Sequence, residues 1–117
     1  MFYAVGRLDL QIPGSQSLKE KRSVIGALKA RLAQRLHCAV AEVDHQDLLQ
    51  RAAIGCAFVV SGPTAGTNAL EAARREVEQD PRVWVIDFAT HVAALGDESS
   101  QWHWDEDENE DDDDGGE

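Results

Sequence analysis

The sequence predicts an α+β fold of the ferredoxin-like class, with the element order βαββαβ, an antiparallel four-stranded sheet and two helices on one face. Three observations predict it. Four segments alternate in a way typical of strands, and two others repeat apolar residues at helical spacing. The six segments follow one another within the first 90 residues or so. A chain of 117 residues is long enough for one small domain with a modest core.

Charge divides the chain into two parts. All eleven Lys and Arg precede Gly96 together with ten acids, so residues 1–96 carry +1, whereas residues 97–117 hold twelve acids and no Lys or Arg. We therefore expect a ferredoxin-like domain over residues 1–96 and a disordered acidic tail over residues 97–117. The tail would raise solubility or, alternatively, imitate nucleic acid and shield the basic first helix.

The first strand is expected from Phe2 to Ile12, because residues such as Ala4, Leu8 and Leu10 share one face. The opposite face begins apolar at its N-terminal end and becomes polar. The sequence Pro13-Gly14-Ser15 ends the strand.

The first helix is expected over Leu18–Leu36. Ser17 and Glu20 have the spacing of a capping box, in which the serine oxygen accepts from the Glu20 amide and the glutamate accepts from the serine amide. The apolar stripe of this helix contains one charged residue, Lys21. We expect Lys21 to reach solvent at the helix end or to meet a carboxylate, with Glu42 as the candidate.

Two strands, Cys38–Asp44 and Leu48–Val60, are expected to form a hairpin. A turn centred near residue 47 would place Cys38 opposite Cys56. Because both cysteines lie in apolar strand segments, we expect buried free thiols and no disulfide.

The second helix is expected over Ala65–Gln79, and the last strand over Arg82–Thr90. Both faces of this strand are apolar, so periodicity leaves its inward face open. In the first helix, Gly26 costs about 1 kcal/mol relative to alanine. Close packing against the alanine-rich second helix would explain it, and a site that tracks a nucleic-acid backbone is the alternative.

Several sequence motifs carry a family resemblance. They are Ser17-Leu18-Lys19-Glu20-Lys21-Arg22-Ser23-Val24-Ile25, Ala41-Glu42-Val43-Asp44-His45-Gln46-Asp47-Leu48, Gln50-Arg51-Ala52 and Asp80-Pro81-Arg82-Val83. In these motifs the chain resembles the bacterial YlxP-like family of unknown function over roughly residues 1–90. The resemblance implies a small ferredoxin-like domain and a gene context of transcription and ribosome-maturation factors. The chain departs from the family at Leu49, where a Trp is usual, and in its acidic tail.

Two groups of residues are candidate interaction sites. A partner-binding surface is expected on the first helix and the hairpin, comprising Lys19, Arg22, Lys29, His45, Gln46, Asp47, Gln50 and Arg51. Positive charge in the first turns is unfavourable by roughly 0.3–1 kcal/mol per residue, so a phosphate would suit this helix start, although solvated surface charge is the simpler explanation. An interface on the outward sheet face is expected at Tyr3, Val5, Ala57 and Val59, unless residues 91–95 cover it.

Other function classes lack their sequence signals. His45 and Asp47 could act as acid and base, but no nucleophile can be named beside them. The cysteines and histidines lack metal-ligand spacing, and the glycines near residue 62 lack the lysine of a phosphate-binding loop, so we expect no metal and no cofactor. No apolar run is long enough to span a membrane, and we expect a cytoplasmic protein.

These observations favour a non-enzymatic binding protein. The resemblance implies a partner in ribosome or RNA metabolism, such as RNA or a ribosomal subunit. The alternative is a protein-interaction module that dimerises through the open sheet face.

Overall fold

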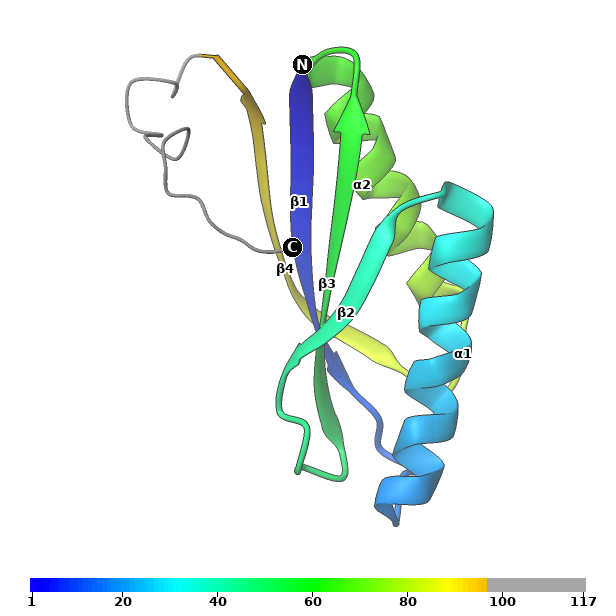
Figure 1. Cartoon of the computed structure of the whole chain (residues 1–117). Helices are drawn as coiled ribbons and strands as arrows, with labels where there is room; N and C mark the ends of the chain where they lie inside the picture. The colour runs from blue at the N-terminus through cyan, green and yellow to red at the C-terminus, as the bar shows by residue number, and fades with distance from the viewer. Residues whose placement is uncertain (97–117) are drawn as a thin grey trace, which may run out of the picture.

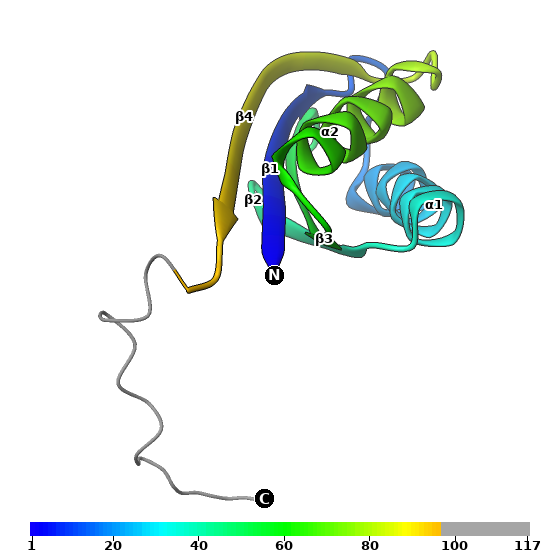
Figure 2. The ribbon, with the colours of Figure 1, turned by 90° about the horizontal axis from the view of Figure 1, so that it is seen from above.

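The computed structural model describes residues 1–96 and confirms the predicted fold. The elements are β1 (Phe2–Gln11), α1 (Leu18–Leu36), β2 (Ala39–Asp44), β3 (Arg51–Val60), α2 (Pro63–Glu78) and β4 (Trp84–Ala94). The strands form one antiparallel sheet in the order β2-β3-β1-β4 (Figure 1). Both helices lie on the same side of this sheet (Figure 2). The expected acidic tail lies outside the described residues.

The core lies between the sheet and the two helices. On the central strands, Leu8 and Ile54 are fully buried, and on the helices so are Leu28, Leu32 and Val77. These residues belong to the apolar stripes that the sequence predicted. Neither helix of residues 1–96 is both long and apolar enough to cross a membrane.

Helix α1 has the predicted bounds because its start carries the expected cap. The Glu20 amide donates to Ser17 Oγ at 3.1 Å. Glu20 Oε1 accepts from the Gln16 amide at 2.8 Å, not from the Ser17 amide as expected. The Glu20 carboxylate thus accepts from an amide one residue further back than expected. The helix ends at Leu36, and the next residue, His37, has a left-handed backbone with φ 54°.

The predicted hairpin register was wrong by two residues. Val40, not Cys38, lies opposite Cys56. The connection spans residues 45–50, so β3 begins at Arg51 and not at Leu48, and a bulge follows Glu42. Because the loop is longer than expected, the centre of the hairpin moves, and each residue of β2 pairs with a different residue of β3 than the prediction gave. Both cysteines are free thiols.

Helix α2 begins at Pro63, two residues before the expected start. Proline is favoured in the first turn, because its missing amide proton has no intrahelical acceptor there. The helix ends at Glu78, close to the expected Gln79.

A bulge explains why the inward face of β4 could not be assigned from periodicity. Val85 pairs with Leu10 and Phe88 pairs with Leu8, so β4 has one extra residue between these pairs. Val85 and Phe88 both pack against the core. The inward set therefore changes from odd to even residue numbers within one strand. The strand also continues to Ala94, beyond the expected end at Thr90.

The predicted reason for Gly26 was wrong. A side chain built at Gly26 would meet no atom within 4 Å, so α2 does not approach there. The close approach occurs at Gly66 of α2, where a Cβ would lie 3.0 Å from Val92 Cγ1 and 3.3 Å from Ala4 Cβ. The small residue therefore lets α2 approach the sheet closely. It does not serve the packing of α1 against α2.

Candidate interaction surfaces

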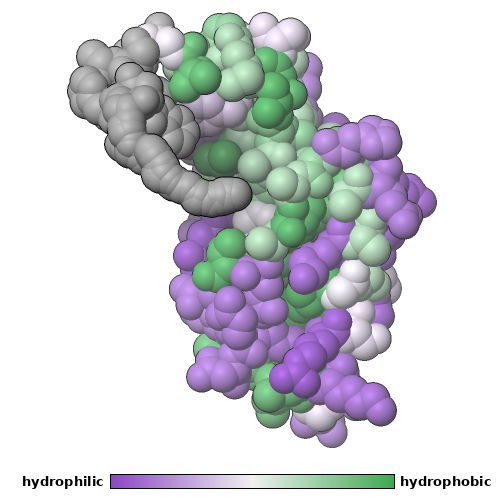
Figure 3. Space-filling view, viewed as in Figure 1, coloured by the Kyte–Doolittle hydropathy of each residue, from purple (hydrophilic) through white to green (hydrophobic). Residues whose placement is uncertain are grey.

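The outer face of the sheet, opposite the helices, is apolar in the half near the start of β1. Tyr3 lies opposite Val59 and Val5 opposite Ala57 on the two central strands. The exposed fraction is 75% for Val59 and 37% for Val5. In Figure 3, hydrophobic residues gather in the upper part of the view and hydrophilic residues in the lower part. We call the apolar half, centred on these four residues, the outer apolar face.

The outer apolar face extends onto both edge strands. Val43 of β2 is 48% exposed, and a Cβ at Gly55 would lie 3.0 Å from its Cγ1. On β4, His91 pairs with Val5, and its ring centroid lies 6.1 Å from that of Tyr3. Shallow grooves of about 300 Å³ run on both sides of Val5. Alternation from Ala39 and Ala41 places Val43 on this face. Sequence reasoning missed it because Glu42, at an inward position, interrupts the apolar pattern of the strand.

The expected cover for this face is wrong. Residues 91–95 were candidates to lie across it, but they continue β4 along the edge of the sheet. Ala93 pairs with Tyr3, and the Leu95 amide donates to the Met1 carbonyl at 2.8 Å. This segment widens the outer apolar face and does not cover it.

The other half of the outer face carries charges of both signs. Arg7 donates to Asp9 at 3.0 Å and to Asp44 at 3.3 Å. The pKa of Asp44 is lowered, first by the hydrogen bond from the His45 amide and then by that from Arg7. Asp87 pairs across the strands with Asp9. Cations and carboxylates therefore border the apolar half.

A buried lysine joins the start of α1 to the hairpin. The Lys21 side chain is 2% exposed, and its Nζ lies 3.1 Å from Glu42 Oε2, as the sequence predicted. The geometry is that of an ion pair without hydrogen-bond alignment. Nζ also donates to the carbonyl of His45, whose left-handed backbone has φ 61°. Lys21 therefore fixes the hairpin and is unavailable to a partner.

The structure places the predicted partner-binding residues in two groups. Around the hairpin, Gln46 Nε2 donates to the Glu42 carbonyl, and Gln50 Nε2 donates to the carbonyls of Pro13 and Ser15 at 3.2 Å. Both glutamines thus have structural roles. His45 is half-buried and Asp47 exposed.

On α1, Lys19 and Arg22 are exposed and form no ion pair with another residue in 1–96. Lys29 lies eight residues beyond Lys21, about 12 Å along the helix, and so stands apart from the hairpin. Arg51 begins β3, half-buried. Of the expected set, Lys19 and Arg22 present the most accessible positive charge.

Chemistry at the cysteines is disfavoured by their surroundings. Burial raises the pKa of the Cys56 thiol to about 11, and the nearby Cys38 adds to the shift. Burial also raises the pKa of Cys38. Both thiols are therefore protonated near neutral pH, whereas the thiolate is the reactive form. Within residues 1–96, no group of three or more His, Cys, Asp or Glu side chains is placed to hold a metal ion.

The sequence assigns the chain to a protein family. Residues 4–90 match the family described as "Protein of unknown function (DUF503)", and the chain belongs to it. A search of curated proteins found no match.

Three solved structures show a distant likeness. A structural-genomics protein, YJCS, is 9% identical with a TM-score of 0.47, over 78% of this chain and 97% of that one. A REP-associated tyrosine transposase bound to a REP hairpin is 10% identical with a TM-score of 0.45, over 85% of this chain and 60% of the transposase chain. A dimeric ferredoxin-like protein from an uncultured marine organism is 6% identical with a TM-score of 0.43, over 82% and 97% of the two chains. Likeness at this level carries no argument about function.

Proposed function

We propose that this member of the DUF503 family is a non-enzymatic binding protein of the cytoplasm that acts as a homodimer joined through the outer apolar face. The observation that supports it is the exposure of Val59 and Val5 at the centre of an apolar surface that no segment of residues 1–96 covers. Apolar patches of this kind on a small domain mark interaction sites.

A second copy of the chain suits this face because of how charge is arranged around it. A two-fold axis places the same patch on both sides of the interface, so the patch must complement itself. The apolar half of one copy would pack against the apolar half of the other. Arg7, Asp9, Asp44 and Asp87 supply both signs at the border, where an interface is polar.

Net charge predicts how salt affects the dimer. Each copy carries −11, so two copies repel one another. Added salt screens this repulsion while leaving apolar burial intact, and dimerisation should therefore strengthen as salt is raised.

Sedimentation velocity over a range of protein concentrations tests the proposal. The wild type should sediment as a dimer, and Val59→Asp as a monomer, because it places a charge at the centre of the interface. Asn68→Asp adds the same charge on an exposed position of α2 and should leave the dimer intact. A monomeric wild type at every concentration would refute the proposal, as would a dimeric Val59→Asp.

RNA or a ribosomal subunit is the second candidate partner, as the YlxP-like resemblance implies. The observation that favours it is the exposed strip of Arg22 and Gly26 on α1, with Lys19 close by. Against it, Arg7, Arg31, Arg74 and Arg82 are each paired with carboxylates, which leaves little clustered positive charge for phosphates.

Cosedimentation with ribosomal subunits tests the second candidate. Binding should fall for the triple variant Lys19→Ala/Arg22→Ala/Arg51→Ala and should weaken with salt. The control variant Arg35→Ala/Arg74→Ala/Arg75→Ala removes equal charge elsewhere and should bind like the wild type. A stable dimer that never comigrates with subunits would exclude this candidate and keep the first.

A further inference from the structure

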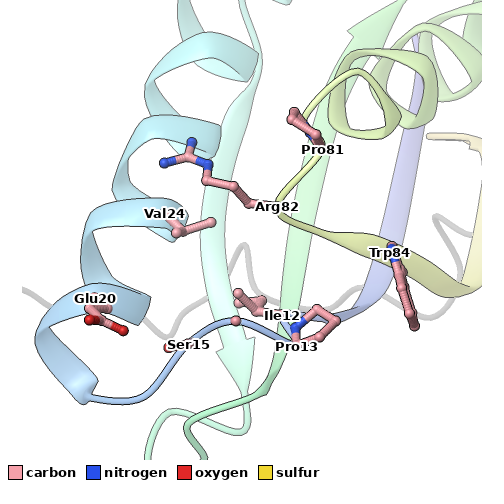
Figure 4. A pocket seen from close by; sticks show the side chains of 9 residues that line it. Ile12, Pro13, Ser15, Glu20, Val24, Pro81, Arg82 and Trp84 are labelled. Carbon is pink, nitrogen blue, oxygen red and sulfur yellow. The ribbon is translucent and has the colours of Figure 1, made fainter.

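A cavity of about 360 Å³ lies where β1 ends and β4 begins. The first turns of α1 form one side of it, the start of β4 the other, and the loop after β1 its base (Figure 4). Its volume lies within the range of small-molecule sites, which is about 300–1,000 Å³. None of the surfaces described above uses it.

The walls of the cavity combine apolar surface with two opposite charges. Ile12, Pro13 and Val24 supply apolar surface. Glu20 stands on the α1 side, and Arg82 reaches toward α1 from the loop before β4 (Figure 4). The cavity therefore offers an acceptor and a donor beside an apolar wall.

Both charged side chains are held in place by other residues. Arg82 Nε and Nη2 donate to the buried carboxylate of Asp80 at 2.9 and 2.7 Å. Glu20 Oε1 accepts from the Gln16 amide. Within residues 1–96, Arg82 Nη1 and Glu20 Oε2 take part in no such hydrogen bond, so each group retains capacity for a ligand. Groups positioned in advance lose little conformational entropy on binding.

Trp84 lines the cavity with an exposed aromatic surface. Its exposed fraction is 59%, unusually high for so large an apolar side chain. It lies on the β4 side of the cavity, and Glu20 lies on the opposite α1 side (Figure 4). An indole in this position is suited to stacking on a flat heterocycle.

We propose that this cavity binds a purine base, with guanine preferred. The ring would stack on Trp84. Guanine presents adjacent N–H donors, which Glu20 Oε2 can accept, and the acceptors O6 and N7, which can accept from Arg82 Nη1. The site lies at the opposite end of β1 from Tyr3 and Val5, about 25 Å away at 3.3 Å per residue, so it is independent of the proposed dimer.

An aromatic side chain of a peptide could use the same apolar wall. It would not use the carboxylate and the guanidinium together, because a phenyl or indole ring lacks the paired donors and acceptors. A purine would therefore use more of the groups that line the cavity than a peptide side chain would. Binding of a peptide side chain is one of the results that the experiment can give.

Fluorescence titration tests the purine site. The variant Trp102→Phe/Trp104→Phe leaves Trp84 as the sole tryptophan. GMP should quench its emission saturably and bind at least tenfold more tightly than CMP. Glu20→Gln should reduce GMP affinity about tenfold, because one strong acceptor is lost, and Glu71→Gln on α2 is the matched charge control.

Three outcomes would overturn the proposal. One is the absence of saturable quenching by GMP. Another is equal affinity for GMP and CMP. The third is tighter binding of N-acetyl-tryptophanamide than of GMP in isothermal titration calorimetry, which would assign the cavity to an aromatic side chain of a protein partner. Circular dichroism of each variant verifies that it is folded.

Discussion

Both faces of the sheet carry apolar side chains, but the two faces differ in their surroundings. On the inner face Leu8 and Ile54 have no exposed surface, whereas on the outer face Val59 is 75% exposed. All three residues lie on the two central strands. Apolar side chains therefore do not by themselves determine burial. The inner face is buried because both helices lie over it.

Charged residues show the same contrast. Lys21 of α1 is buried against Glu42 on the inner side of the sheet, whereas Arg7 pairs with Asp9 and Asp44 on the open side. A buried ion pair whose partner is removed leaves an unsolvated charge, but an exposed one is readily hydrated. Substitutions matched across the two faces should therefore have unequal effects.

The largest contrast should come from apolar truncation. Leu8→Ala removes buried contacts and should lower the free energy of unfolding by about 2–5 kcal/mol. Val59→Ala should change that of the isolated monomer by less than about 0.5 kcal/mol. Urea unfolding at low protein concentration measures both. Similar losses for the two variants would show that the outer face is covered.

Ion pairs should show the next largest difference. Lys21→Ala should destabilise the domain by about 3 kcal/mol, because Glu42 keeps a charge in a mostly buried site. The double variant Lys21→Met/Glu42→Gln should recover part of the loss. Arg7→Ala should leave stability almost unchanged. Thermal unfolding at one pH compares the three, and an equal effect of Lys21→Ala and Arg7→Ala would contradict the contrast.

Two aspartates extend the comparison to pH. Hydrogen bonds from Arg82 hold the pKa of Asp80 well below its usual range, and the pKa of the exposed Asp44 is also lowered. A depressed folded pKa stabilises the domain above the unfolded value of about 3.9, and this is lost as pH falls through the folded pKa. Asp80→Asn should therefore lower the free energy of unfolding by about 1–2 kcal/mol at neutral pH. This loss should become smaller as the pH falls below about 4.

Asp44→Asn is the control for this pH dependence. Its partner Arg7 and its own side chain are in contact with solvent, so the substitution should have little effect at any pH. Urea unfolding from neutral pH downward measures both variants. A constant cost of Asp80→Asn across that range would show that the charge of Asp80 is not what stabilises the fold.

The smallest effects should come from the two helix glycines. Gly26→Ala should stabilise the domain by up to about 1 kcal/mol, because the site is open and alanine favours a helix. Gly66→Ala should destabilise it by about 1 kcal/mol or more, since the new Cβ would crowd Val92 and Ala4. Differential scanning calorimetry resolves both signs. A destabilising Gly26→Ala would mean that α1 has a neighbour on that side.

Some features were predictable because their signals are local. Ser17 and Glu20 mark the start of α1. The position of Lys21 in an apolar stripe left two possibilities, solvent at the helix end or a carboxylate, and the candidate carboxylate, Glu42, is its partner. The register that places Val40 opposite Cys56 was not predictable, because it depends on a six-residue connection and a bulge. The cavity beside Trp84 was also missed. Its walls come from segments far apart in the chain.

The sequence by itself determined the order of the elements, the limits of α1 and the apolar periodicity of each strand, since these follow from the chemistry of neighbouring residues. Tertiary structure alone decided that no segment of residues 1–96 covers the outer apolar face and that β4 changes its inward set at a bulge. The physical reason is that periodicity shows that a strand has two faces but does not say what covers either one. Which face is buried depends on the packing of both helices on one side of the sheet and on the path of β4 along its edge.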